Sequence, residues 1–115
     1  MSDRIGTMVA AALFSLSLSL GAQAQGLTVA QYQHPRTPQD LTRNKAYLLG
    51  VADGLISYNA VVQSKRFCVP GLMPHLTFEQ ANDIMLRWAR KASGGTDLPV
   101  ARAMYFALTK AYPCR

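Results

Sequence analysis

Histidine, cysteine and acidic residues are scarce in this sequence, which limits the chemistry that it can perform. Its 115 residues include two histidines, two cysteines and six Asp and Glu residues in total. His34 and His75 each lie beside a proline, far from one another and not at ligand spacing from a cysteine. Because a metal site needs three or four convergent ligands, we expect no metal. The absence of a C-x-x-C-H motif excludes covalently attached haem, and no cofactor is expected.

Sequence motifs of covalent catalysis are missing as well. Neither G-x-S-x-G nor S-x-x-K occurs in the chain. Using either cysteine as a nucleophile would leave the other one unpaired. Glu79 and Asp83 are spaced by one helical turn on a face that we expect to be solvated, whereas a glycosidase holds its two carboxylates on opposing walls of a cleft. We therefore expect no catalytic residue and no enzyme activity.

Residues 1–24 have the pattern of a secretory signal peptide. Arg4 contributes a weakly positive start, and Met8 to Leu20 is an apolar stretch of the usual length. Ala22-Gln23-Ala24 is a small-x-small cleavage site. A membrane anchor is the alternative interpretation, but spanning a bilayer takes about 20 apolar residues. We expect a periplasmic protein that begins at Gln25 and has no membrane segment after cleavage.

Basic residues outnumber acidic ones by twelve to six, which gives a net charge of +6 at pH 7. They are spread along the chain, and only Lys65-Arg66 and Arg87-x-x-Arg90-Lys91 form local clusters. Because an exported protein rarely meets nucleic acid, this charge favours a solvated surface that prefers an acidic partner. With 16% charged and 50% hydrophobic residues, the chain is not expected to be disordered.

Two cysteines in an exported domain predict one disulfide, between Cys68 and Cys114. A mature chain of residues 25–115 is small enough to be marginally stable without such a link. The chain-entropy model assigns about 4 kcal/mol to a bridge that closes a loop of this length. Two free, buried thiols are the alternative.

An apolar period of three to four residues predicts an all-α fold, a small helical bundle of three main helices stapled by the disulfide. No stretch alternates apolar and polar residues as a strand would. Residues 25–39 show no sustained period, so we expect an irregular N-terminal arm there, followed by a helical domain at 40–115. The helices are predicted at about 38–64, 78–93 and 98–112.

Local signals mark the ends of these helices. Thr37-Pro38-Gln39-Asp40 combines an N-cap threonine, a proline at the first helical position and an acidic residue that suits the helix dipole. Thr77-Phe78-Glu79-Gln80 has the spacing of a capping box. Gly94-Gly95 ends the second helix, and Thr96 or Asp97 is expected to cap the third.

Gly50 and Gly54 lie four residues apart inside the first predicted helix. Each costs about 1 kcal/mol relative to alanine in a helix interior. Close packing of another helix over this bare strip, from the same bundle or from a second copy of the chain, would compensate for that cost. A kink in the helix is the alternative.

Four short motifs follow one another from Tyr47 to the C-terminus. In chain order they are Tyr47-x-x-Gly50-x-x-x-Gly54, Phe67-Cys68-x-Pro70, Thr77-x-x-Gln80 and Ala111-Tyr112-Pro113-Cys114. Taken together, over residues 40–115, they resemble the Rap1a/Tai family of immunity proteins from type VI secretion systems. Cys68 and Cys114 match the cysteine pair of that family. Residues 40–46 contain no cysteine, whereas family members often carry a further pair upstream of the tyrosine motif.

The resemblance implies an all-helical periplasmic protein without activity of its own. Such proteins bind a peptidoglycan amidase effector and block its active site, which protects the producing cell and its kin. The implied partner is a cell-wall amidase. The sequence leaves open whether the protein also forms a homodimer. The residues alone leave two alternatives: an envelope scaffold or binding protein for anionic cell-wall material, and a small acid-stress chaperone. The chaperone is disfavoured because acid would add charge to a chain that is already basic.

Blocking an amidase requires a narrow element that enters the cleft of the enzyme. The turn Ser93-Gly94-Gly95-Thr96-Asp97 is the predicted element, because two glycines permit a tight projecting tip. An ordinary turn between two helices is the alternative for these residues. The loop from Pro70 to His75 is the rival tip, since its prolines would preorganise it.

Overall fold

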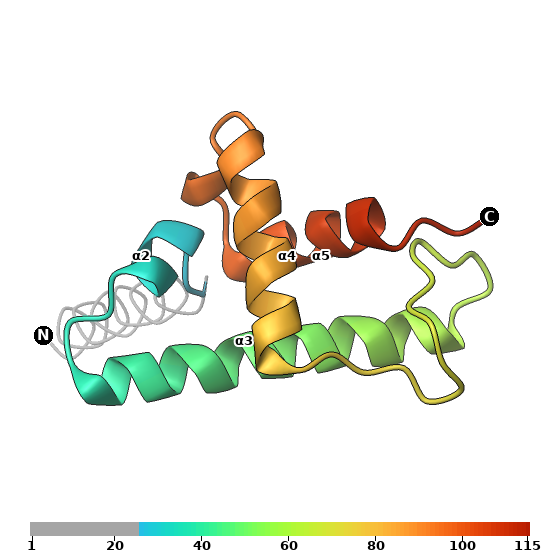
Figure 1. Cartoon of the computed structure of the whole chain (residues 1–115), viewed down its shortest axis with the longest axis horizontal. Coiled ribbons are helices and arrows are strands. Elements are labelled where there is room, and N and C mark those ends of the chain that lie inside the picture. The colour runs from blue at the N-terminus through green and yellow to red at the C-terminus, as the bar shows by residue number, and fades with distance from the viewer. Residues whose placement is uncertain (1–25) are drawn as a thin grey trace, which may run out of the picture.

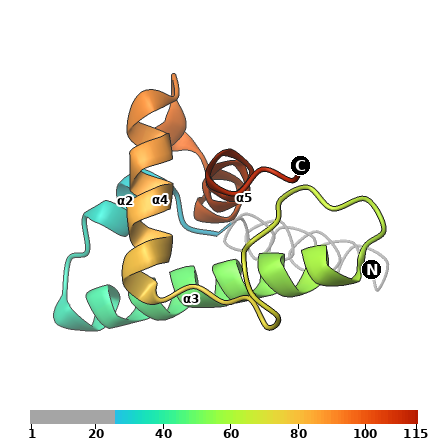
Figure 2. The same ribbon diagram turned by 45° about the vertical axis from the view of Figure 1, so that its right-hand side comes forward.

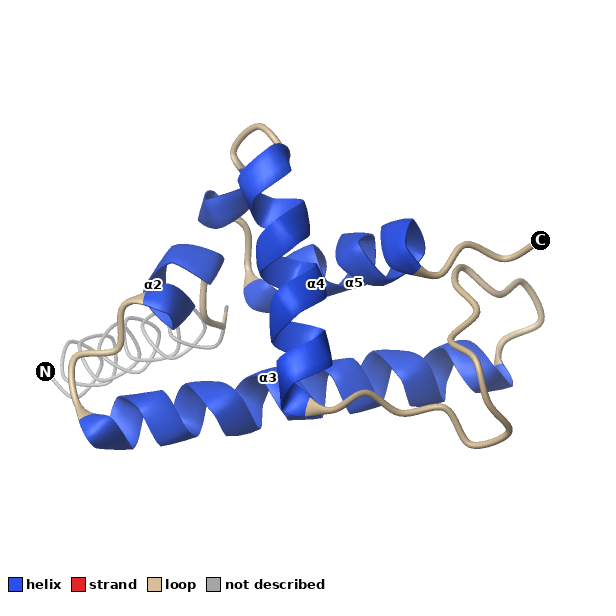
Figure 3. Cartoon of the chain, in the orientation of Figure 1, coloured by secondary structure: helices blue, strands red, loops and turns tan. Residues whose placement is uncertain are grey.

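The computed structural model describes residues 26–115, so the predicted signal peptide and its cleavage site lie outside the described residues. Within this part the chain is helical and forms no strand, which confirms the all-α prediction (Figure 3). A single isolated β-bridge joins Thr28 to Pro99. In chain order the elements are α2 (Val29–Gln33), α3 (Pro38–Val61), α4 (Phe78–Lys91), the 3-10 turn η1 (Gly95–Asp97) and α5 (Val100–Ala111).

The long helix α3 forms the base of the molecule, and the other elements pack on one side of it (Figures 1 and 2). Helix α4 crosses α3 steeply, while α5 runs above the C-terminal half of α3 and packs against α4. A long loop of residues 62–77 leads from the end of α3 back to the start of α4 (Figure 1). This arrangement buries one face of α3 and leaves the opposite face in solvent.

The core lies where the three main helices meet, and two loop residues and the N-terminal segment complete it. Small and medium side chains dominate, which lets the helices approach one another closely. The buried apolar residues are Val29, Tyr32, Leu48, Ala52, Ile56, Phe67, Leu76, Ala81, Met85, Ala89, Val100, Ala103, Met104, Ala107 and Leu108.

Both helix starts marked by threonine are confirmed. The Thr37 hydroxyl accepts a 3.0 Å hydrogen bond from the Asp40 amide, and Pro38 is the first residue of α3. At α4 the capping box is complete, because the Gln80 amide donates to the Thr77 hydroxyl and the Thr77 amide donates to the Gln80 side chain. These caps satisfy amide donors that have no partner within the helix.

The expectation of an irregular arm is wrong for residues 29–33, which form α2. Thr28 and Gln31 make a capping box of their own, with hydrogen bonds of 3.0 and 3.1 Å. The segment is then tied to the turn before α5, since the Val29 amide donates to the Leu98 carbonyl at 2.9 Å. A helix of five residues is too short to show an apolar period, so the pattern could not reveal it.

The helix ends differ from the predicted ones by a few residues. Helix α3 stops at Val61, because Val62 already has extended backbone dihedrals. Helix α4 stops at Lys91. The predicted cap of the third helix at Thr96 or Asp97 is wrong: these residues belong to η1, and Pro99 is the N-cap of α5.

Candidate functional site

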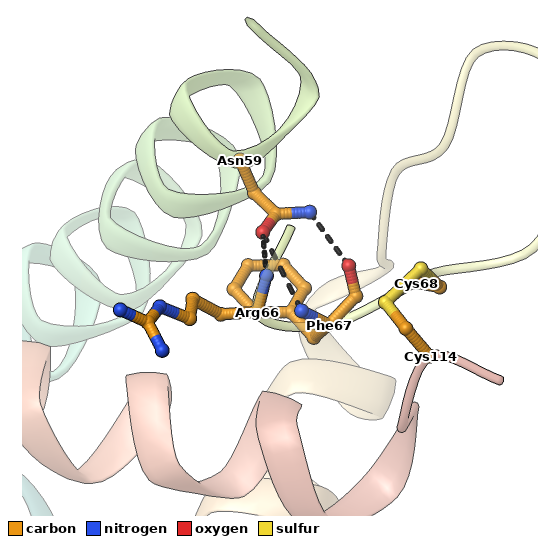
Figure 4. The surroundings of a disulfide bond; sticks show 5 residues. All are labelled: Asn59, Arg66, Phe67, Cys68 and Cys114. Atoms are coloured by element: carbon orange, nitrogen blue, oxygen red, sulfur yellow. Dashed lines mark hydrogen bonds between the residues drawn. A yellow bond between two sulfur atoms is a disulfide. The ribbon is translucent and has the colours of Figure 1, made fainter. Parts of the chain in front are cut away.

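The disulfide predicted between Cys68 and Cys114 is present (Figure 4). It joins the loop after α3 to the chain end after α5, across a sequence separation of 46 residues. Next to it, the Cys68 amide donates a 2.7 Å hydrogen bond to the Tyr112 carbonyl. The bridge therefore fixes the C-terminal end of α5 to the first part of the 62–77 loop.

Asn59, near the end of α3, holds the same loop from the other side (Figure 4). Its side-chain amide donates to the Phe67 carbonyl at 2.6 Å, and its side-chain oxygen accepts from the amides of Arg66 and Phe67 at 2.9 and 3.4 Å. The Phe67 ring is buried and meets the Tyr105 ring edge to face, with centroids 6.4 Å apart. The only sequence signal for this contact is a polar residue on the apolar face of α3.

Beyond this anchor, loop 70–75 presents two large apolar side chains to solvent. Leu72 is fully exposed and Met73 is 88% exposed. The loop returns to the core at Leu76, which is buried just before the Thr77 cap of α4. A hollow of about 340 Å³ separates the loop from the end of α3, with Ala60, Leu72 and Pro74 among its lining residues. Loop 70–75 is thus held at both ends and exposed between them.

The turn at residues 93–97 lies at the end of α4 that is remote from α3 (Figure 1). Gly94 has a φ of +70°, a left-handed conformation that favours glycine. Gly95 is buried, and a Cβ at this position would stand 2.4 Å from the Ala89 carbonyl oxygen. Ser93 and Asp97 are exposed, whereas Thr96 is partly covered. One of the two glycines therefore serves close packing onto α4, and only part of the turn faces outward.

No helix of the described residues packs over Gly50 and Gly54, so the expected contact within the bundle is wrong. Both glycines are exposed, and no atom lies within 4 Å of the place where a Cβ would stand. The reason is geometric, because the buried face of α3 carries Leu48, Ala52 and Ile56. A residue two positions after a buried one lies about 200° around the helix and faces away.

Groups for metal binding do not gather in the part of the chain described. Among residues 26–115 no three His, Cys, Asp or Glu side chains lie close enough to hold a metal ion. His34 and His75 are both exposed and lie on separate loops. The helices of this part are also too short or too polar for any of them to cross a membrane.

A family model describing Rap1a immunity proteins matches residues 19–114. The chain belongs to the Rap1a immunity protein family. The match spans every described helix, the long loop and both cysteines. Searches among curated proteins and among solved structures return no match.

Membership in the Rap1a family makes this chain an immunity protein directed against a secreted effector. Proteins of this kind act as inhibitors rather than as enzymes, by binding the effector. The features that matter in this Rap1a protein are therefore its exposed surfaces. Three stand out: loop 70–75, the turn at 93–97 and the helix faces that no other element covers.

Proposed function

We propose that this Rap1a protein is a periplasmic immunity protein that binds and blocks a peptidoglycan amidase effector of a type VI secretion system. The observation that carries the proposal is loop 70–75, which exposes Leu72 and Met73 on a segment held at both ends. Neighbouring large apolar side chains that are exposed together form an apolar patch, and such patches mark interaction sites. An inhibitor needs such an element, because it must fill a cleft in the enzyme.

The anchoring of loop 70–75 favours tight binding. Asn59 and the disulfide fix its approach from α3, and the burial of Leu76 fixes its return to α4. Pro70 and Pro74 restrict the backbone between these anchors. A segment that is already ordered loses little conformational entropy on binding, so more of the contact energy contributes to affinity. We therefore assign the main contact with the amidase to this loop.

The turn at 93–97 remains a proposed second contact. Ser93, Gly94 and Asp97 are exposed at the remote end of α4. Gly95 packs closely on the backbone of Ala89, and this contact gives the turn a defined shape. It offers polar rather than apolar groups, so its contribution would lie in orientation more than in affinity.

The periplasm is the compartment that fits the chain. Residues 1–24 have the pattern of a signal peptide. The disulfide of the mature chain is of a kind that persists in oxidising compartments and is rare in the cytosol. An amidase delivered into the periplasm attacks peptidoglycan there, so its inhibitor must fold in the same space.

The test uses the mature, oxidised protein and a cell-wall amidase effector, which is sought first among the products of the neighbouring genes. Release of peptide stems from purified peptidoglycan is measured at increasing inhibitor concentrations. We expect inhibition that is complete at a stoichiometric ratio. Absence of inhibition and of binding would overturn the proposed function.

Two matched substitutions then compare the candidate contacts. Leu72→Asp should weaken inhibition by about tenfold or more, because it puts a charge where an apolar side chain is desolvated. Ser93→Asp should weaken it by about threefold or less, since a polar contact at the rim contributes little. The reverse order would move the main contact to the turn at 93–97.

A second candidate function is supported by the net charge of +6. A basic periplasmic protein can bind anionic cell-wall material. Pelleting with purified sacculi tests this, and binding that falls steeply with added salt would favour it.

A further inference from the structure

Helices α4 and α5 leave an open groove between their C-terminal halves, with a volume of about 590 Å³. Five of its lining residues are apolar: Ile84, Trp88, Ala92, Ala107 and Ala111. The Trp88 ring is held in place by stacking on Phe106, with centroids 5.3 Å apart. Because three of the five are alanines, their small side chains leave room for a side chain supplied from outside.

The remaining lining residues of the groove are all basic. They are Arg87 and Lys91 from α4 and Lys110 from α5, and all three are exposed. Arg87 pairs with Asp83 one turn earlier in α4. Within residues 26–115 no carboxylate lies within ion-pair distance of Lys91 or Lys110. The groove therefore combines an apolar floor with two uncompensated positive charges.

The helix dipole explains only part of this arrangement. Basic residues in the last turn of a helix are favourable on any side of it. Arg90 is also in the last turn of α4, and it does not line the groove. The cations of two different helices nevertheless line one groove, and a local concentration of positive charge attracts an anionic ligand.

The groove is also connected to the surface assigned to the effector. The lining of the groove extends along α5 to Ala111, the last residue of that helix. The carbonyl of the following residue, Tyr112, accepts the hydrogen bond from the Cys68 amide. The disulfide then leads into the loop that carries Leu72. The C-terminal end of α5 thus links the groove, through the disulfide, to the anchored start of this loop.

We propose that the groove between α4 and α5 binds an acidic polypeptide segment of the cognate effector. An apolar side chain of that segment lies between Trp88 and the alanines, and its carboxylates pair with Lys91 and Lys110. The inference rests on the proposed function, because the occupant is the effector itself. A polypeptide segment fits this lining, since the floor is apolar apart from the indole N–H of Trp88 and the cations at its rim can pair with carboxylates.

The experiment measures, by calorimetry, the dissociation constant between the mature, oxidised protein and the amidase effector used to test the proposed function. Lys110→Glu is compared with Arg102→Glu, which makes the same charge change on α5 at an exposed residue outside the groove. Ala111→Trp, which fills the groove without changing its charge, is compared with Ala101→Trp, which is exposed on α5 elsewhere. Thermal unfolding of each variant shows that it is folded. Lys91→Glu provides a second charge reversal, on α4.

We expect Lys110→Glu, Lys91→Glu and Ala111→Trp each to weaken binding by about tenfold, and both controls to change it by less than about threefold. If the unaltered protein binds but groove and control variants do not differ, the inference is overturned while the proposed function stands. If the unaltered protein does not bind the amidase, both are overturned. Binding to purified sacculi that is lost in Lys110→Glu, with amidase binding unchanged, would assign the groove to a cell-wall polymer and overturn the inference.

Discussion

A single side-chain amide, that of Asn59, determines how the chain leaves α3. It is buried, and it satisfies one carbonyl and two amides of residues 66 and 67. No other side chain in the described part replaces these bonds. Because loop 70–75 starts three residues beyond this contact, the geometry of the proposed amidase contact depends on it.

Replacing Asn59 by alanine is expected to lower the free energy of unfolding by about 2–3 kcal/mol, because buried backbone groups lose their partners. Chemical denaturation of the oxidised protein measures the change. Ser57→Ala, at an exposed position of the same helix, is the control and should change stability by less than about 0.5 kcal/mol. Equal effects in the two variants would contradict the role assigned to Asn59.

Tyr32 gives the protein a dependence on alkaline pH. Its ring is buried and its hydroxyl donates a 2.6 Å hydrogen bond to the Asn82 side-chain oxygen. Desolvation by burial raises the pKa of Tyr32 from 10.0 to about 12. The folded state therefore holds the phenol proton more tightly than the unfolded state. This contribution to stability is complete below pH 10 and is lost as the pH rises toward 12.

We predict that Tyr32→Phe removes this contribution. At about pH 8 the variant should be less stable by about 1 kcal/mol, because the hydrogen bond to Asn82 is lost. At about pH 11 the difference in the free energy of unfolding between the two proteins should shrink. Ionisation of Tyr32 then destabilises the unaltered protein, whereas the variant has no hydroxyl to ionise at this position. Tyr58→Phe, at a position 68% exposed, is the control. A difference that is constant with pH would refute the assignment.

Features set by a few neighbouring residues, or by a count of two cysteines, were readable from the sequence, whereas contacts whose distant partner can be any residue were not. The caps at Thr37 and Thr77 and the cysteine pair follow from local spacing and from composition. The bonds of Asn59 and the contact of Gly95 with Ala89 depend on how separate segments meet. A lone asparagine or glycine in a sequence does not specify its tertiary neighbour.

At the scale of the elements, α3 is unusual because its outer face bears two glycines that contact nothing. Helix propensity alone would disfavour both positions. A Cβ at Gly50 or Gly54 meets no described atom. The folded chain itself therefore gives no reason for these glycines, and a second copy or a partner that covers α3 would supply one.

Gly50→Ala and Gly54→Ala are each expected to raise the free energy of unfolding by up to about 1 kcal/mol, because alanine restricts the unfolded chain and fits without contact. Gly95→Ala should have the opposite effect, with a loss of about 1–3 kcal/mol from its contact with the Ala89 carbonyl. Denaturant titration at two protein concentrations measures both. Destabilisation by Gly50→Ala that depends on concentration would indicate a second copy packed on this face.

The sequence pattern located the three main helices because each has a long apolar stripe and a recognisable start. It missed α2, whose five residues are held by a capping box and by the backbone of residues 98–100. It also extended α3 to residue 64, since Val62 continues the apolar face although its backbone is already extended. The turn that follows a helix decides where the helix ends, and the apolar period of the helix carries no information about that turn.

At the scale of the whole molecule, the disulfide holds the bundle closed. The segment between Cys68 and Cys114 contains α4, η1 and α5, and the bridge ties both of its ends to one place beside the end of α3. The crossing of α4 and α5 over α3 was not predictable, because amphipathic helices of similar length can be arranged in several ways. The bridge and the bonds of α2 to residues 98–100 select one of them.

Removing the bridge by Cys68→Ala and Cys114→Ala together is therefore expected to lower the free energy of unfolding of the whole domain as well as the order of the neighbouring loop. A loop of 46 residues corresponds to about 4 kcal/mol in the chain-entropy model, and measured losses for small secreted domains are about 2–5 kcal/mol. The C-terminal end of α5 and loop 70–75 lose their common anchor, so amidase inhibition should weaken even at temperatures where the variant is still folded. Circular dichroism and peptidoglycan hydrolysis on the same samples separate the two effects. A folded double variant that inhibits as strongly as the oxidised protein would show that the preorganisation of this loop contributes nothing to the proposed function.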